Sequence, residues 1–240
     1  MATLTEEAPN LDVNKVRIVF LDIDGVINSN KTWLLAGGWP GLNEDKEAST
    51  GYWGGPKAKV ISKPYVTFPD AIDKYAVGLL NKLLVATNSH IVVSSTWREG
   101  LDVYQLRDVL EERGFDPKRI IGKTQDTGHS RGEQIFNYIQ SLGEKRSYGG
   151  PDFAVQNGRL ISSLSKVEMT LNSYVIVDDI PDFTDDQEKN HYVETNDDLG
   201  LTLKDTLRMG EILTGKYFGM NQLMHGEGYA GKILSVTPIQ

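Results

Sequence analysis

Two aspartates stand one residue apart directly after a short apolar run, in the stretch RIVFLDIDGVINSN at residues 17–30. Asp22 and Asp24 therefore lie at the end of a segment that is typical of a buried strand. Carboxylates are costly to bury and they repel each other when close together. A pair of this kind needs a cation nearby to offset both costs.

Two other apolar runs also end in polar side chains. The run at 90–94 leads into Ser94, Ser95 and Arg98, and the run at 173–179 ends in Asp178 and Asp179. If the strands are parallel, their carboxyl ends meet at one edge of the sheet, where ligands bind in open α/β folds. Four carboxylates at one edge predict a hard cation such as Mg²⁺, which binds carboxylates together with water and substrate phosphate oxygens.

The elements that must hold these side chains alternate along the chain. Apolar runs predict strands at 16–21, 90–94, 119–124, 173–179 and, with a weaker pattern, 191–196. Helical periodicity predicts helices at 69–87, 101–113, 130–143 and 202–215. Such alternation indicates an α/β protein with a Rossmann-like, doubly wound parallel sheet covered by helices on both faces.

The chain divides into a core with additions. We expect a flexible lead-in at 1–15, a core at 16–215, insertions at 28–68 and 144–170, and a Gly-rich tail at 216–240. The first insertion contains Trp33, Trp39 and Trp53, and we expect it to form an ordered cap. In the second insertion, Asn157 and Gly158 predict a hairpin turn.

Composition narrows the classes of function. The 240 residues carry a formal net charge of −8, which disfavours a large surface for duplex DNA. There is no cysteine, and so no disulfide, zinc thiolate or cysteine nucleophile. Since no signal peptide or membrane span is recognised, we expect a cytoplasmic protein, in the host cytoplasm if a phage encodes it.

Three motifs carry a resemblance to a known superfamily. The segments FLDIDGVIN, IVVSSTWR and YVIVDD, in this order, resemble the first, second and fourth motifs of the haloacid dehalogenase (HAD) superfamily of aspartate-nucleophile phosphatases. The resemblance covers roughly residues 16–213. It is closest to HAD domains of nucleotide-processing and RNA-repair proteins, including polynucleotide phosphatases, which are often encoded by phages.

The resemblance implies roles for the acidic residues. Asp22 would be the nucleophile that forms an aspartyl-phosphate, and Asp24 the general acid and base. Gly25 would permit the turn that aims both carboxylates at one phosphate. Mg²⁺ would be held by Asp22, by the backbone carbonyl of Asp24, and by Asp179 or Asp178.

The resemblance also implies groups that bind the phosphate. Ser94 or Ser95 would donate a hydrogen bond to it, and Ser94, the first polar residue after the apolar run, is preferred. Arg131, at the start of a predicted helix with Ser130 as its N-cap and Glu133 three residues on, would neutralise its charge. Lys123 competes for this role, and Lys166 ranks last because it lies in an irregular insertion.

Residues next to these motifs have two interpretations each. Arg98 could grip a substrate phosphate with two hydrogen bonds. Trp97 could stack on a base, although packing in the core is the more common place for tryptophan. His129 and His191 show no ligand spacing, and Asp182 could support the metal from outside its ligands.

Three functions follow, from two classes. The first is a Mg²⁺-dependent phosphomonoesterase acting on a small phosphorylated substrate, a nucleotide or a nucleic-acid terminal phosphate. The second is a polynucleotide 3′-phosphatase acting on a single-stranded end, and the third a non-catalytic binding protein on the same fold. No phosphate-binding P-loop motif is present, so the chain holds no kinase half of that type.

Overall fold

The computed structural model describes residues 17–35, 72–99, 101–142 and 171–226 in full, and the backbone of short segments at 15–16, 59–60, 67–68, 153–156, 159–162 and 170. Most of the predicted cap lies outside the described residues, Trp39 and Trp53 included. So do Lys166 and residues 227–240 of the predicted tail. The interpretations placed on them remain predictions.

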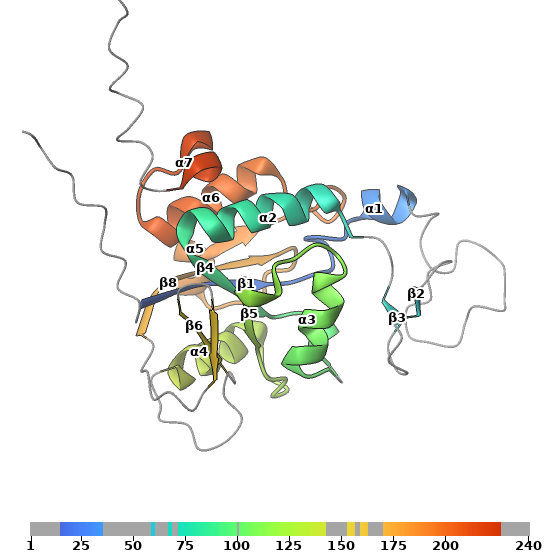
Figure 1. Cartoon of the computed structure of the whole chain (residues 1–240), viewed down its shortest axis with the longest axis horizontal. Helices are drawn as coiled ribbons and strands as arrows, with labels where there is room; N and C mark the ends of the chain where they lie inside the picture. Colours follow the sequence, from blue (N-terminus) through green and yellow to red (C-terminus); the bar gives the residue numbers. More distant parts are fainter. Residues whose placement is uncertain are drawn as a thin grey trace, which may run out of the picture.

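A five-stranded parallel sheet forms the centre of the protein (Figure 1). Its spatial order is β5-β4-β1-β8-β9, and every neighbouring pair is parallel. The strands are β1 (Lys15–Leu21), β4 (Ser89–Val93), β5 (Ile120–Lys123), β8 (Thr170–Asp178) and β9 (Tyr192–Glu194). All five predicted strands are present, and the doubly wound α/β fold is confirmed.

The strand order reverses beside β1. The chain moves outward from β1 to β4 and β5, and then crosses back to place β8 and β9 on the other side of β1. Leu21 of β1 is level with Val177 of β8, so the residues that follow these two come out of the sheet side by side. Such a reversal opens a crevice beyond the strand ends, which is where doubly wound sheets bind ligands.

Alternate side chains of β1 enter two separate apolar cores. Val19 and Leu21 belong to the larger core, on the face covered by α2 (Lys74–Thr87), α6 (Leu203–Thr214) and α7 (Met220–His225). Ile18 and Phe20 belong to the smaller core, on the face covered by α4 (Arg131–Ser141). Figure 1 shows α2, α6 and α7 on one side of the sheet and α4 on the other. With both faces buried, β1 reads as a continuous apolar run.

Capping side chains fix where the helices begin. Ser130 accepts from the backbone N–H of Glu133 at the start of α4, as predicted. The helix predicted at 69–87 begins later, at Lys74, because the Asp73 carboxylate accepts from the backbone N–H of Tyr75 and so acts as the N-cap. The acidic segment after β8, for which no helix was predicted, forms α5 (Asp185–Asn190) with Thr184 as its N-cap.

The packed part of the chain continues beyond residue 215. The ring of Phe218 lies against Gly210 of α6, where a Cβ atom would come within 2.1 Å of the ring. Leu223 of α7 is also buried in the larger core. The first part of the segment predicted as a tail therefore helps to cover the sheet.

The remaining elements are short. They are α1 (Asn30–Leu35), α3 (Val103–Glu111), the 3₁₀ helices η1 (Thr96–Arg98) and η2 (Pro117–Arg119), and the antiparallel pairs β2 (Lys59–Val60) with β3 (Thr67–Phe68) and β6 (Phe153–Gln156) with β7 (Arg159–Ser162). Gln156 pairs with Arg159, which confirms the hairpin predicted between them. In the part of the chain that the structure describes, no helix is both long and apolar enough to span a membrane.

Candidate functional site

Asp22 is the first residue beyond β1 and is almost completely buried, with 3% of its surface exposed. Its backbone N–H donates to the carbonyl of Val177 at 3.0 Å, which continues the pairing of β1 with β8. Burial and the nearby Asp178 carboxylate raise the pKa of Asp22 to about 8. The Arg131 guanidinium and a hydrogen bond from the Ser95 hydroxyl pull this pKa back down. A carboxylate held in this way needs more positive charge than the described residues supply.

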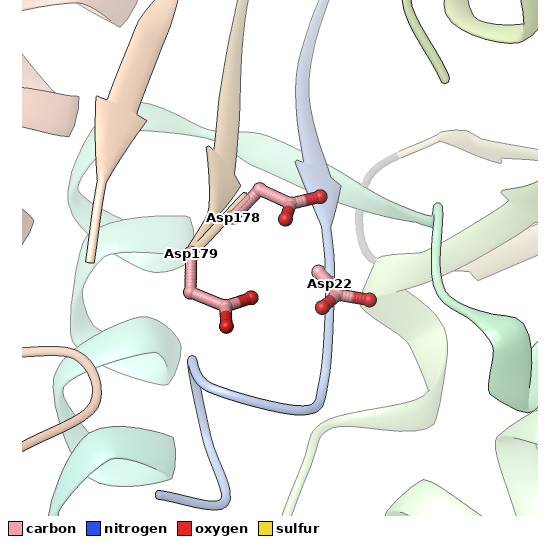
Figure 2. A group of neighbouring side chains, drawn as sticks. All are labelled: Asp22, Asp178 and Asp179. Carbon is pink, nitrogen blue, oxygen red and sulfur yellow. The ribbon is translucent and has the colours of Figure 1, made fainter. Parts of the chain in front are cut away.

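Asp22, Asp178 and Asp179 form a group of three carboxylates whose ligand oxygens lie within 4.8 Å of one another. Figure 2 shows the three side chains converging between the ends of β1 and β8. Burial raises the pKa of Asp178 and of Asp179 as well. The buried Oδ1 of Asp22 has no hydrogen-bond donor among the described residues. Oxygen ligands at this spacing fit a hard divalent cation, which would relieve the repulsion among them.

Among the described residues, Arg131 is the cation that forms ion pairs with this group. It is the first residue of α4, and its Nη1 forms an ion pair with Asp178 Oδ2 and lies 3.4 Å from Asp22 Oδ1. Burial lowers the pKa of Arg131, but the Asp22 and Asp178 carboxylates outweigh this effect and raise it. Arg131 is therefore charged at any working pH and partly offsets the two carboxylates.

The loop after β8 holds the start of α4 in place. The Asp182 carboxylate accepts from the backbone N–H of Arg131 at 2.9 Å, and the Asp182 carbonyl accepts from that of Gly132 at 2.9 Å. A Cβ atom at Gly132 would come within 2.5 Å of Gln187 Oε1 and 2.9 Å of the Phe183 backbone. This close approach explains the glycine and fixes the point from which the arginine reaches the carboxylates.

Asp24 lies across the turn from the three-carboxylate group and is not a member of it. Its Oδ1 accepts from Asn28 Nδ2 at 2.6 Å, and its Oδ2 accepts from Trp97 Nε1 at 3.0 Å. Burial of the carboxylate raises the pKa of Asp24, and these two hydrogen bonds act in the opposite direction. The two aspartates of the first motif thus have different surroundings, which is typical of carboxylates with different roles.

Gly25 is required for two physical reasons. Its φ is +74°, in the left-handed region that favours glycine. A Cβ atom there would also lie only 2.2 Å from Cγ of Asp179. The Gly25 carbonyl accepts from Thr195 Oγ1 at 3.1 Å, which ties this turn to the loop after β9. The turn predicted at Gly25 is present, and it leaves just enough space for one of the three carboxylates.

The two serines of the second motif have different contacts. Ser95 is the serine whose hydroxyl lowers the pKa of Asp22, and this hydroxyl accepts from the Trp97 backbone N–H at 3.4 Å. Ser94 Oγ instead lies 3.5 Å from Thr124 Oγ1, at the end of β5. Both serines are buried, and Ser95 is the one beside the predicted nucleophile.

Arg98 is a buried guanidinium close to the same site. Its Nη2 donates to Gln134 Oε1 at 2.6 Å, while its Nε and Nη1 are buried and lack an acceptor among the described residues. Burial lowers the pKa of Arg98, and the charge of Arg131 lowers it further, while the Asp22 carboxylate acts in the opposite direction. A buried cation with open N–H groups is costly until an anion or water accepts from them.

The other candidates from the sequence lie elsewhere. Lys123 donates to the carbonyls of Arg98 and Leu101, so it braces the loop after β4 and is not free to reach the carboxylates. His129 is exposed and 3.4 Å from Glu133. The ring of His191 is stacked on Tyr174, at a centroid distance of 3.9 Å. These contacts place His129 at the surface and His191 against Tyr174.

Three residues of the site were not predicted from the sequence. Asn28 contacts Asp24, Gln134 contacts Arg98, and Thr195 contacts Gly25. Asn28 lies within the first motif, where its distance of four residues from Asp24 could have suggested the contact. Gln134 and Thr195 are distant in sequence from their partners, and no local pattern identifies them.

Comparison with known proteins agrees with this geometry. Residues 18–206 match the family described as the HAD domain in Swiss Army Knife RNA repair proteins. The match spans more than half of the chain and includes every described site residue named above. Neither the curated proteins nor the solved structures contain a match.

Proposed function

The chain belongs to the family of HAD domains in Swiss Army Knife RNA repair proteins, and we propose that it is a phosphomonoesterase that works through an aspartyl-phosphate on Asp22. Family membership supports a phosphatase-type activity. The nucleophile, the metal and the substrate are inferred from the site. A non-catalytic role is less consistent with the site, because four carboxylates with raised pKa values are costly to keep without a reaction that uses them.

One observation carries the proposal. Asp22 is buried at the point where the strand order reverses, next to a cationic side chain, Arg131, and two further carboxylates, Asp178 and Asp179. A carboxylate confined there can reach a phosphorus atom bound beyond the strand ends. Arg131 would neutralise part of the negative charge of that phosphate. This arrangement suits covalent catalysis by a carboxylate.

We infer that the metal is Mg²⁺, held by Asp22, Asp178 and Asp179. Asp22 Oδ1 accepts no hydrogen bond from a described residue and lies 3.4 Å from Arg131 Nη1, and Asp179 fits closely against Gly25. Both observations are consistent with this assignment. Asp178 Oδ2 pairs with Arg131 and its Oδ1 accepts from the Ile180 backbone N–H, so Asp178 would bind the metal in addition to one of these contacts. When bound, the metal would neutralise phosphate charge and bring the phosphate close to Asp22.

The first chemical step transfers the phosphoryl group to the protein. An oxygen of Asp22 forms a bond to phosphorus as the ester P–O bond breaks, and the pair of electrons in that bond goes to the departing oxygen. Asp24 gives this oxygen its proton, so that an alcohol leaves rather than an alkoxide. Asp24 enters the step protonated, which its raised pKa favours.

The second step returns the protein to its starting state. Asp24, now ionised, takes a proton from water while the water oxygen forms a bond to phosphorus. The bond between phosphorus and Asp22 breaks, the carboxylate is regenerated and inorganic phosphate leaves. Asp24 is again protonated, so the two steps together consume one water and release one alcohol and one phosphate.

The geometry supports a narrower proposal for the groups that bind the phosphate. We assign the hydroxyl contact to Ser95, because it is the serine against Asp22, in place of the Ser94 preferred from the sequence. We assign the neutralising cation to Arg131, because Lys123 is occupied by backbone carbonyls. We propose that the Nε and Nη1 groups of Arg98 donate hydrogen bonds to phosphate oxygens or to water bound to the phosphate.

We propose that the substrate is a nucleotide or a nucleic-acid terminal phosphate. The family description, which names RNA repair, favours a terminal phosphate and makes a polynucleotide 3′-phosphatase the second candidate. Trp97 does not support base stacking, because it is buried in the larger core and its indole N–H is engaged by Asp24. Trp33 is also buried, so neither described tryptophan offers an open face for a base.

Phosphate release from a panel of substrates tests the proposal. We expect the wild type with Mg²⁺ to hydrolyse nucleoside monophosphates or 3′-phosphorylated oligonucleotides, and the variant Asp22→Asn to release no phosphate although it folds. A folded Asp22→Asn variant that still released phosphate from an aryl phosphate would contradict the mechanism.

Salt dependence separates the two substrate classes. A polynucleotide substrate predicts faster turnover of 3′-phosphorylated oligonucleotides than of mononucleotides, with a rate that falls steeply as salt rises, because several phosphates contribute to binding. A flat salt dependence and equal rates would instead support a mononucleotide substrate.

A further inference from the structure

We propose that Trp97 is a positioning residue that holds the carboxylate of Asp24 in place for proton transfer to the leaving group, with Asn28 as the second holding residue. This inference rests on the proposed function, because it assumes that Asp24 is the general acid. It assigns Trp97 a role different from contact with a base.

The two residues hold opposite ends of the carboxylate. Trp97 Nε1 donates to Oδ2 at 3.0 Å, and Asn28 Nδ2 donates to Oδ1 at 2.6 Å. One donor comes from η1, after β4, and the other from the turn after β1. Because the donors belong to different segments and bind different oxygens, together they fix both the position and the rotation of the carboxylate plane.

Trp97 is itself firmly placed. The side chain is 9% exposed and packs in the larger core. Ser95 caps its backbone N–H, and the guanidinium of Arg113 lies 6.0 Å from the ring centroid. The rigid ring carries its N–H to a fixed point, and this is the geometry that a positioning residue needs.

Asp24 would otherwise be poorly constrained. Asp24 lies three residues beyond the last residue of β1, and the residue as a whole is exposed although its carboxylate is partly enclosed. The turn around it is fixed by backbone bonds, among them Gly25 N–H to the Asn28 carbonyl at 2.7 Å, but these bonds leave χ1 and χ2 of Asp24 free. Each carboxylate oxygen can take part in about two hydrogen bonds, so each keeps a free position for a proton while its donor is bound.

The consequence of this role depends on the leaving group. An alkyl phosphate, such as a nucleoside monophosphate, needs a proton on its departing oxygen. A 4-nitrophenyl phosphate releases a stabilised phenolate that needs little help from an acid. A residue that acts only by positioning Asp24 should therefore matter for the first substrate and hardly matter for the second.

The test compares kcat/KM of wild type and Trp97→Phe on a nucleoside monophosphate and on 4-nitrophenyl phosphate, with Mg²⁺ present. The ratio kcat/KM includes the step in which the leaving group departs and excludes later hydrolysis of the aspartyl-phosphate. Phenylalanine keeps an aromatic ring in the core and removes the N–H. We expect a loss of about tenfold on the nucleotide and less than about twofold on the aryl phosphate, a fraction of the roughly 10²–10⁴-fold that a general acid contributes.

Two further variants complete the test. Asn28→Ser removes the other donor and should show the same preference for the aryl phosphate, independently of any packing change at Trp97. Trp33→Phe, at a second buried tryptophan, is the matched control and should change both rates by the same factor. In an Asp24→Ala background, Trp97→Phe should cause no further loss on the nucleotide.

The outcomes distinguish the inference from the proposed function. Equal losses on both substrates in Trp97→Phe and Asn28→Ser, or a further loss in the Asp24→Ala background, would overturn the positioning role. If the wild type hydrolysed neither substrate, the proposed function would fail instead. A leaving-group effect that disappears with Asp24 would support both.

Discussion

Replacing Gly25 with alanine should separate backbone strain from loss of the metal site. The added Cβ would lie 2.2 Å from Cγ and 2.3 Å from Oδ2 of Asp179, far inside the roughly 3.5–4.0 Å at which carbon atoms pack. The Asp179 side chain must therefore move by more than an ångström. It is only partly buried, so it can swing away, and the three-carboxylate group would lose one member.

The magnitude has two parts. A left-handed φ costs about 1–2 kcal/mol for alanine, which lowers the melting temperature by about 2–4 °C per kcal/mol in a domain of this size. Changes outside the first layer of metal ligands weaken binding by roughly 10–100-fold, so displacing a ligand should cost at least tenfold in Mg²⁺ affinity.

Gly215→Ala supplies the matched control. Gly215 has a φ of +68°, close to the +74° of Gly25, but apart from its chain neighbours no described residue places an atom within 4 Å of the position of its Cβ. Both variants should lose similar stability in thermal unfolding with EDTA present. Only Gly25→Ala should lose Mg²⁺ affinity in calorimetric titration. Equal Mg²⁺ affinities in the two variants would refute the role given to the approach of Asp179 to Gly25.

Three more predictions follow from particular side chains. Without divalent metal, burial keeps the folded-state pKa of Asp22 far above its unfolded value of 3.8, so the free energy of unfolding should fall as pH rises from about 4 toward 8. Asp22→Asn should flatten this fall in melting curves recorded with EDTA, and an unchanged slope would contradict it. Burial lowers the pKa of His90 from 6.5 to about 4, so the free energy of unfolding should fall as pH falls through this range. The loss should reach up to about 3 kcal/mol relative to His90→Leu. Identical dependence of stability on acid pH in the two proteins would refute this. Gln134→Leu removes the acceptor of Arg98 and should raise KM by about tenfold with little change in kcat, whereas an unchanged KM would remove Arg98 from the phosphate site.

The sequence predicted the sheet and the strand ends for a simple reason. The strands have apolar residues on both faces, so β1 and β8 appear as continuous apolar runs that stop at Asp22 and Asp178. Because β1 and β8 pair in parallel, the residues at the ends of these two runs, Asp22 and Asp178, lie close together. The start of α4 was predicted from a different signal, the capping Ser130, which is local in the sequence.

Contacts between distant segments were less predictable. A choice between Ser94 and Ser95 depends on how the chain turns after β4, and the apolar pattern ends where that turn begins. The sequence left two interpretations for Trp97, base stacking and core packing. The hydrogen bond from its indole N–H to Asp24 depends on how η1 lies against the turn after β1, which the sequence does not show. Gln134 reaches Arg98 across 36 residues, and its type alone suggests nothing.

The start of α2 shows a different limit. Helical spacing predicted a helix from residue 69, yet the Asp73 carboxylate accepts from backbone N–H groups of the first turn, and the helix begins at Lys74. Helical spacing alone does not show at which residue such a helix begins. The structure also continues the core past Gly215, because Phe218 returns to fill the space over Gly210.

Trapping the covalent intermediate tests the central claim most directly. The wild type would be mixed with substrate and Mg²⁺, quenched in acid and reduced with borohydride, which converts a phosphorylated aspartate to homoserine, and the modified residue would be located by mass spectrometry. We expect modification at Asp22 and none in Asp22→Asn. With 4-nitrophenyl phosphate, whose phenolate leaves with little help from an acid, we expect more of it in Asp24→Asn, because only hydrolysis of the intermediate is then slowed. Modification at another residue, or rapid phosphate release with no trapped intermediate in either active form, would contradict it.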